Sequence, residues 1–224
     1  MNTVVKGSLS ATLGLAAFAA MLFLPAGTFH YWQAWAFLAV FALSTWIPSV
    51  YLMRTNPAAL ERRMHVGPSA ETRPLQRILM AVIFICFPAM FVVSALDHRF
   101  GWSPVPASVS VIGDVLVATG LGLAMVVIIQ NSYAAANVTV EAGQRLVSSG
   151  LYGLVRHPMY TGNVFLMLGI PLALDSYWAL LFVIPGVIVL ILRIRDEEDL
   201  LSHELSGYRE YTGKVHYRLL PYVW

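Results

Sequence analysis

Long apolar runs, separated by short polar segments, dominate the hydropathy pattern of the chain. Four of these runs approach the roughly 20 residues that an α-helix needs to cross a bilayer. They cover about residues 9–25, 32–53, 78–96 and 109–129. The pattern predicts an all-α protein, a polytopic transmembrane helical bundle of about five to six membrane helices.

Two shorter apolar runs follow near the C-terminus, at residues 160–174 and 177–192, and Asp175-Ser176 separates them. Each run is short for a full crossing. We therefore expect a tightly packed helical hairpin here. The charged residues after it, 193–224, are expected to form a cytoplasmic C-terminal segment.

Composition supports the membrane class and excludes several others. The chain of 224 residues is 58% hydrophobic and 12% charged, which is not typical of a soluble domain. A net charge of +2 gives no reason to expect a nucleic-acid partner. Cys86 is the only cysteine and lies in an apolar run, so we expect neither a disulfide framework nor a metal site.

The distribution of cations predicts the orientation. With a cytoplasmic N-terminus, 13 of the 14 Lys and Arg residues fall in cytoplasmic segments, and Arg99 is the exception. This asymmetry fits the positive-inside rule with an even number of crossings. We expect a single integral-membrane domain, in a bacterial inner membrane, with the functional segments facing the cytoplasm. Its parts would be two spans (1–53), a loop (54–77), two spans (78–129) and a catalytic region (130–224).

The most informative stretch is G-L-Y-G-L-V-R-H-P-M-Y-T-G, residues 150–162. Pro158 suits the first position of a helix, where a missing N–H costs nothing, and His157 falls at the cap. A helix start offers free N–H groups and a positive dipole end, which suit an anion. Arg156 and Tyr160 lie beside this start. The alternative is that these side chains only anchor a helix at the membrane interface.

A second polar cluster, R-I-R-D-E-E-D at residues 193–199, directly follows an apolar run. On a helix, Arg193 can pair with Glu197, four residues on, and a solvated helix start with surface ion pairs is the simple interpretation. However, one of the adjacent residues Glu197 and Glu198 should face a pocket on the membrane side. Downstream, Tyr208, Tyr211 and Tyr217 form either an aromatic belt or a pocket wall.

Three stretches together resemble the isoprenylcysteine carboxyl methyltransferase family, which is related to the membrane phospholipid methyltransferases. They are the 150–162 stretch, the R-x-x-x-E-E pattern at 193–198, and the tail pattern G-Y-x-x-Y…V-x-Y-R-L-x-P. The loop pattern R-x-N-P…E-R-R at 54–63 is similar to bacterial members. The resemblance implies that S-adenosylmethionine is bound without a Rossmann domain, whose glycine fingerprint this chain lacks.

The resemblance also implies site residues. Those expected to bind the cofactor are Leu154, Val155, His157, Tyr160, Glu197, Glu198 and Tyr211. The chemistry of methyl transfer, and not the resemblance, suggests the catalytic candidates, which are Arg156, Arg193 and Glu198, with Arg145 as a third arginine. An acceptor carboxylate needs no base, only an arginine that fixes it, whereas an amine acceptor would need a base such as Glu198 or His157.

The expected acceptor is a lipophilic or prenylated molecule, most like an isoprenylcysteine carboxylate, that enters from the membrane lipids. Three alternatives stay open. The first is a phospholipid N-methyltransferase. The second is an NADPH-dependent reductase of the sterol or steroid reductase type, whose tail is similar. The third is a non-catalytic helical scaffold.

Overall fold

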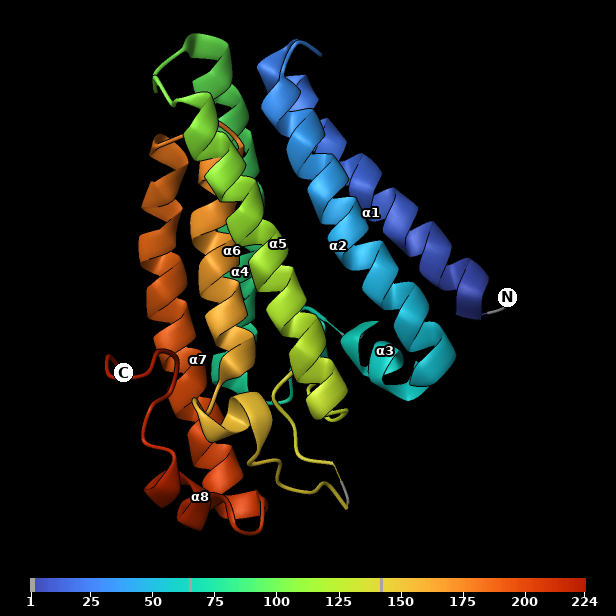
Figure 1. Cartoon of the computed structure of the whole chain (residues 1–224), viewed down its shortest axis with the longest axis vertical. Coiled ribbons are helices and arrows are strands. Elements are labelled where there is room, and N and C mark those ends of the chain that lie inside the picture. Colours follow the sequence, from blue (N-terminus) through green and yellow to red (C-terminus); the bar gives the residue numbers. More distant parts are fainter. Residues whose placement is uncertain (1–2, 65, 142) are drawn as a thin grey trace.

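The computed structural model describes residues 3–64, 66–141 and 143–224, and every regular element in these ranges is helical. Eight α-helices follow one another in these ranges (Figure 1). They are α1 (Thr3–Ala26), α2 (Trp32–Thr55), α3 (Pro57–Met64), α4 (Pro74–Phe100), α5 (Ala107–Gln130), α6 (Pro158–Ala173), α7 (Val183–Glu204) and α8 (Tyr208–Lys214). Short 3₁₀ helices occupy Pro68–Ala70, Gly150–Gly153 and Trp178–Phe182. The predicted all-α class is confirmed.

Four helical segments of the described chain are long and apolar enough to cross a membrane. They are Trp32–Thr55, Pro74–Phe100, Ala107–Gln130 and Trp178–Glu204. Helix α6, with 16 residues, is short, as predicted. The prediction of an equally short partner is wrong, because α7 continues through the charged residues to Glu204. The polytopic membrane bundle is confirmed.

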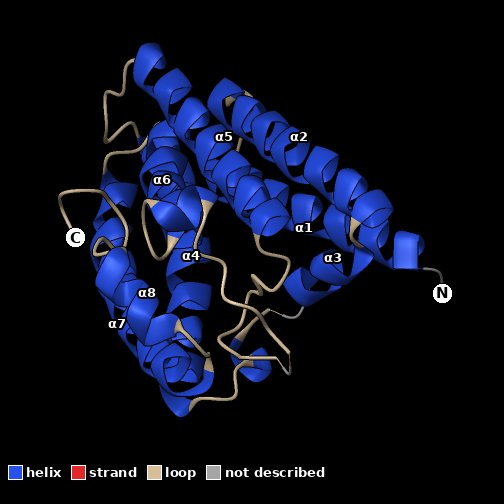
Figure 2. Ribbon diagram, turned by 60° about the horizontal axis from the view of Figure 1, so that its bottom comes forward, coloured by secondary structure: helices blue, strands red, loops and turns tan. Residues whose placement is uncertain are grey.

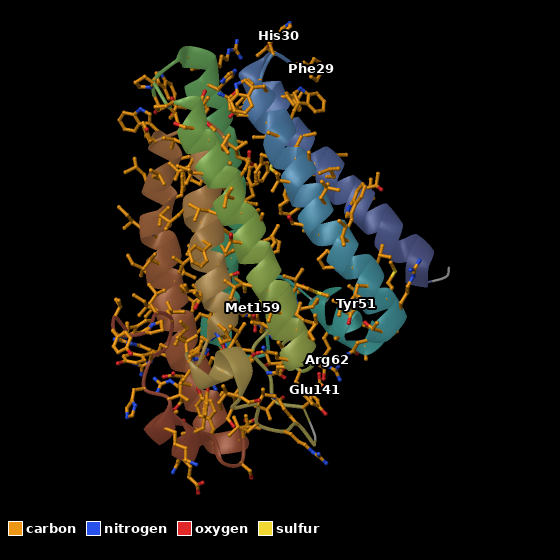
Figure 3. The ribbon with its side chains drawn as sticks, in the orientation of Figure 1. Phe29, His30, Tyr51, Arg62, Glu141 and Met159 are labelled. Carbon is orange, nitrogen blue, oxygen red and sulfur yellow. The ribbon has the colours of Figure 1, made fainter. Side chains whose placement is uncertain are left out.

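The helices divide into two groups. Helices α4 to α7 lie together, and the α1–α2 pair leans against them at one end and diverges from them at the other (Figure 1). Helix α3, the loop after α5 and helix α8 gather at that diverging end (Figure 2). Arg62 and Glu141 mark this end, whereas Phe29 and His30 mark the opposite one (Figure 3). Polar segments far apart in the sequence are thus collected at one end of the bundle.

Glycines bring α5 and α6 into close contact. A Cβ on Gly113 would lie 2.2 Å from the backbone nitrogen of Ala173, and one on Gly120 would lie 2.6 Å from the carbonyl oxygen of Gly162. Small residues at such positions let helix backbones approach within a membrane, where van der Waals packing drives association. This contact fixes α6, and with it the helix start at Pro158.

The far end of the hairpin is held by a buried carboxylate. Asp97, at the end of α4, accepts hydrogen bonds from the Ser103 hydroxyl at 2.7 Å and the Ser176 hydroxyl at 2.6 Å. Ser176 lies in the turn between α6 and Trp178–Phe182. The Asp175-Ser176 interruption therefore connects two helices and also fastens their turn to α4.

The glycine contact predicts a selective loss of stability. Gly113→Ala places a methyl group against the α6 backbone, and we expect it to destabilise the protein by about 1–3 kcal/mol, the usual cost of overpacking. Gly122→Ala, on the same helix with nothing within 4 Å of its Cβ position, is the matched control. Thermal unfolding in detergent should show a lower midpoint for Gly113→Ala only. Equal midpoints would contradict this account of the contact.

Candidate functional site

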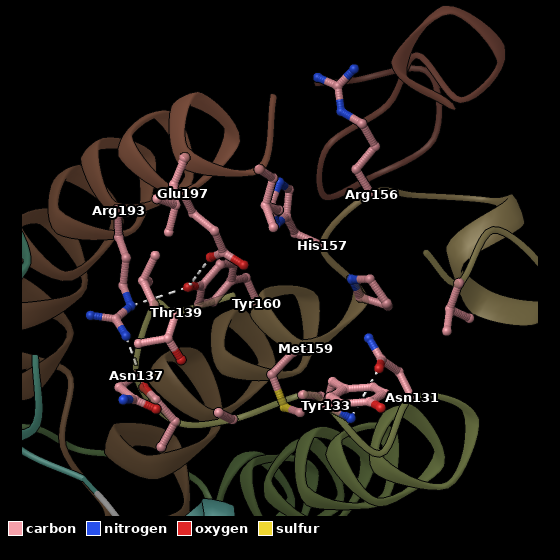
Figure 4. Close-up of a pocket in the computed structure, with 18 of the residues that line it drawn as sticks. Asn131, Tyr133, Asn137, Thr139, Arg156, His157, Met159, Tyr160, Arg193 and Glu197 are labelled. Atoms are coloured by element: carbon pink, nitrogen blue, oxygen red, sulfur yellow. Dashed lines mark hydrogen bonds between the residues drawn. The ribbon is translucent and has the colours of Figure 1, made fainter. Parts of the chain in front are cut away.

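A cavity of about 290 Å³ lies at the end of the bundle where the polar segments gather (Figure 4). Residues 131–141, here called the cavity loop, form one wall. The start of α6, the C-terminal part of α7 and helix α8 form the others, and α3 and α4 complete the enclosure. Elements from both halves of the chain are therefore needed to build it.

The start of α6 follows the sequence prediction only in part. Pro158 is the first helical residue and His157 occupies the cap position. However, the N–H group of His157 donates to the carbonyl oxygen of Arg218 at 2.9 Å, and that of Tyr160 donates to the carbonyl oxygen of His157 at 3.0 Å. The helix start therefore offers an anion fewer free donors than the sequence suggests.

The C-terminal tail, residues 215–224, is pinned to this helix start. The backbone N–H groups of Arg156 and His157 donate to the carbonyl oxygens of Tyr217 and Arg218, both at 2.9 Å. Two segments some sixty residues apart thus pair by main-chain hydrogen bonds. The tail pattern that the sequence analysis singled out has a structural role, because it holds the R-H-P stretch in place.

Glu198 completes this attachment. Its carboxylate lies 2.9 Å from Nε of Arg218 and 3.1 Å from Nε2 of His157. Nε of Arg156 is also close, at 2.8 Å, but its N–H is not directed at the oxygen, so this is a charge contact and not a hydrogen bond. Glu198 is not among the residues that line the cavity. It lies behind the cavity wall and joins α7 to the helix start and the tail.

Glu197, in contrast, faces the cavity. Its Oε2 accepts a hydrogen bond from the Tyr160 hydroxyl at 2.5 Å, and that hydroxyl accepts one from Nε of Arg193 at 3.1 Å (Figure 4). All three residues line the cavity. The two adjacent glutamates therefore point to different sides, as the sequence pattern predicts.

Arg193 is buried, with 4% of its surface exposed, and its guanidinium is surrounded by protein acceptors. It donates to Glu71 at 2.7 Å, to Gln76 at 2.9 Å and to the carbonyl oxygen of Ala136 at 2.8 Å. The predicted helical pair with Glu197 is replaced by an ion pair with Glu71, which precedes α4. Since these contacts engage its donors, Arg193 has little capacity left for an acceptor carboxylate.

The other candidate residues divide between the cavity and its surroundings. Tyr211 lines the cavity and donates to the carbonyl oxygen of Tyr152 at 2.6 Å. Arg156 also lines it, but its guanidinium points away from the cavity toward Glu198 (Figure 4). Leu154, 60% exposed, and Val155, which is buried, are not among the lining residues.

Several lining residues were not among those expected to bind the cofactor or to act in catalysis, although Tyr208 was a candidate for a pocket wall. Tyr152 accepts a hydrogen bond from Nδ2 of Asn131 at 3.1 Å, and burial raises its pKa to about 12, so it stays a neutral phenol. Tyr208 lines the cavity with a buried hydroxyl that has no hydrogen-bond partner in the described part of the chain. Arg63 lines it from α3. Tyr152 lies within the 150–162 stretch and Arg63 ends the 54–63 loop pattern, so the sequence marked both positions but did not show that they share a cavity.

The described residues contain no group of three or more His, Cys, Asp or Glu side chains that could hold a metal ion.

Comparison with known families identifies this region. Residues 109–206 match the model of the phospholipid methyltransferase family. The resemblance to the membrane methyltransferases is confirmed. The matched region contains both the 150–162 stretch and the Glu197-Glu198 pair, so the cavity is built largely from it.

Other matches are partial or distant. A Delta(14)-sterol reductase of Mus musculus is 32% identical over 90 residues, which is 39% of this chain and 22% of the relative. A 7-dehydrocholesterol reductase of Danio rerio is 34% identical over 98 residues, 42% of this chain and 20% of the relative. The chain thus spans about a fifth of these curated relatives. Among solved structures, the eukaryotic intramembrane Ras methyltransferase ICMT is similar, with 16% identity, a TM-score of 0.46 and coverage of 100% of this chain and 88% of that one.

The Glu198 network predicts how the tail can be released. Glu198→Gln leaves the Arg156 and Arg218 charges without their carboxylate, and breaking a buried ion pair costs up to about 3–5 kcal/mol. We expect the tail to detach more often, so that trypsin cleaves faster at Lys214 and Arg218. Glu204→Gln, at an exposed position six residues further along α7, is the control. Unchanged cleavage rates in Glu198→Gln would show that the tail is held by its backbone hydrogen bonds alone.

Proposed function

We propose that this protein is an integral membrane methyltransferase that uses S-adenosylmethionine and transfers a methyl group to a lipophilic acceptor, the carboxylate of an isoprenylcysteine-like molecule. One observation carries the proposal. The region that matches the phospholipid methyltransferase family supplies the motif residues, and the fold places His157, Tyr160 and Glu197 around one cavity.

The lining of the cavity fits this cofactor. Glu197 offers a carboxylate to ribose hydroxyls or to an ammonium group, because its Oε1 makes no hydrogen bond within the described part of the chain, whereas Oε2 is bound by Tyr160. The unpartnered hydroxyl of Tyr208 offers a further polar contact, since a buried polar atom without a partner is costly. Aromatic rings of Tyr160 and Tyr211 suit an adenine and a positive sulfonium. These residues, together with His157, would hold S-adenosylmethionine, which supplies an electrophilic methyl group when bound.

The remaining work of the protein is alignment. A carboxylate acceptor is ionised at neutral pH, so no residue has to remove a proton from it. Positioning two reactants in line and excluding water can contribute about 7–11 kcal/mol. The hydrogen bonds of Arg193 and the ion pairs of Glu198 hold the cavity walls in fixed positions. Loss of Arg193 or Glu198 can therefore lower activity even if neither side chain contacts the reacting atoms.

The topology supports a cytoplasmic site. The segments around 54–77, 131–157 and 205–224 gather at the same end of the bundle (Figures 1 and 2). These are the segments that hold most of the Lys and Arg residues. By the positive-inside rule, this end faces the cytoplasm, and in a bacterial cell the membrane would be the inner one.

The partial matches to two sterol reductases support a second candidate, an NADPH-dependent reductase. A 2′-phosphate calls for arginine contacts. Arg63 and Arg145 line the cavity and could provide them. The two candidates differ in the cofactor that the same cavity accepts, so a binding measurement separates them.

The first test is isothermal titration of the detergent-purified protein with S-adenosylhomocysteine. We expect binding to the wild type, and at least a tenfold loss of affinity in Glu197→Gln, because a charge-assisted hydrogen bond is worth about 1.5–3 kcal/mol. Glu204→Gln should bind like the wild type.

A parallel titration with NADPH tests the second candidate, the reductase. Binding of NADPH together with no binding of S-adenosylhomocysteine would exclude the methyltransferase and support the reductase. If neither ligand binds the wild type, the cavity is not a site for either cofactor, and both proposals fail.

A further inference from the structure

Four arginines line the cavity, and three of them are accounted for. Arg193 is paired with Glu71, and Arg156 with Glu198. Arg145 is exposed to solvent. Only Arg63 is a partly buried lining cation without a carboxylate partner among the described residues.

The surroundings of Arg63 make this charge unusual. Its Nη1 donates to the carbonyl oxygen of Ala135 at 3.1 Å, which is a single neutral contact within residues 3–64, 66–141 and 143–224 for a group with five N–H donors. Burial lowers the pKa of its guanidinium from the ordinary value, and the nearby Arg193 charge lowers it further. A guanidinium nevertheless stays protonated in proteins. The site therefore holds an uncompensated positive charge that an anion would stabilise.

The neighbouring Arg62, on the same short helix, does have a counter-ion. It forms an ion pair with Glu141 at 2.6 Å and lies over the ring of Tyr133 at 5.1 Å (Figure 3). Arg62 lines a second cavity, which the cavity loop also borders, whereas Arg63 lines the first. The two adjacent arginines thus line different cavities, and of the two only Arg63 lacks a carboxylate partner among the described residues.

Apolar side chains accompany Arg63 on the same wall. Among the described residues, the N-terminal half of the chain contributes Arg63, Val66, Met80 and Ile83 to the cavity. Val66 is 52% exposed, so the apolar strip reaches the surface of the bundle. A cation followed by an apolar strip suits an amphiphile with an anionic head.

We propose that Arg63 binds the carboxylate of the methyl acceptor, and that the acceptor is an anionic amphiphile whose chain covers Val66, Met80 and Ile83. The proposal rests on the proposed methyltransferase function. It places the anionic acceptor on the wall formed by α3 and α4, whereas Glu197, which lines the cavity from α7, offers its negative charge to the cofactor. Arg63 offers a counter-ion to a carboxylate and none to an ammonium group, so this wall favours the binding of a carboxylate acceptor.

The test measures binding and does not depend on turnover. Its probes are N-acetyl-S-farnesylcysteine, an acid, and the primary amide of the same molecule, which keeps the chain and removes the charge. We expect the wild type in detergent to bind the acid at least about tenfold more tightly than the amide, and Arg63→Gln to bind both equally. Arg63→Lys, which keeps the charge but not the planar fork, should recover part of the preference.

Two controls separate this effect from misfolding and from general loss of charge. Arg54→Gln removes an exposed arginine from the same side of the protein and should keep the wild-type preference. S-adenosylhomocysteine should bind Arg63→Gln within about threefold of its wild-type affinity, because the residues proposed to hold the cofactor do not include Arg63.

Several results would overturn the proposal. Equal binding of acid and amide by the wild type would show that the cavity does not recognise the charge. An unchanged preference in Arg63→Gln would assign the recognition to another residue. Loss of S-adenosylhomocysteine binding in Arg63→Gln would place the carboxylate of the cofactor on Arg63. Displacement of the acid by lyso-phosphatidylethanolamine, with equal affinity, would identify a lipid phosphate as the anion.

The two proposals fail in distinguishable ways. If the wild type does not bind S-adenosylhomocysteine, the methyltransferase function fails, whatever Arg63 does. If it binds S-adenosylhomocysteine but shows no acid preference that depends on Arg63, only the assignment of the acceptor fails.

Discussion

The buried guanidinium of Arg193 is the interaction on which the cavity depends. Removing a charge from water costs several kcal/mol unless a counter-ion and hydrogen bonds compensate it. Here Glu71 supplies the charge, and Gln76 and Ala136 accept further hydrogen bonds. One side chain thereby ties α7 to the segment before α4, to the first turns of α4 and to the cavity loop. The cavity loop has no helix of its own, so these bonds define where it lies.

Glu197 and Glu198 show how neighbouring residues on a helix acquire different tasks. Consecutive helical positions point about 100° apart, so one carboxylate faces the cavity and the other faces the tail. Glu197 meets Tyr160 inside, whereas Glu198 meets His157 and Arg218 behind the wall. A Glu198 variant that loses activity would therefore do so through the position of the R-H-P stretch.

The membrane-embedded helices also help to fix the position of the cavity walls, but they do so through close packing and not through ion pairs. Within a bilayer, helices associate through close packing and not through exclusion of water. The glycines of α5 and α6 allow this close approach, and Asp97 fastens the turn at the far end of α6. Helix α6 is held along its length, so the position of Tyr160 in the cavity wall is fixed. The fold thus combines a rigid helix pair with a polar end assembled from loops.

The hydropathy pattern alone determined the all-α membrane class, because spanning helices require long apolar runs. Local patterns also located the helix start at Pro158 and predicted that Glu197 and Glu198 face different sides of α7. Only the tertiary structure determined which charged side chains pair with one another. Arg193 pairs with Glu71, which lies 122 residues away in the sequence, so no helical spacing could reveal it. Nor could the pattern distinguish Arg62 from Arg63, because their partners, Glu141 and the carbonyl oxygen of Ala135, lie 79 and 72 residues away in the sequence.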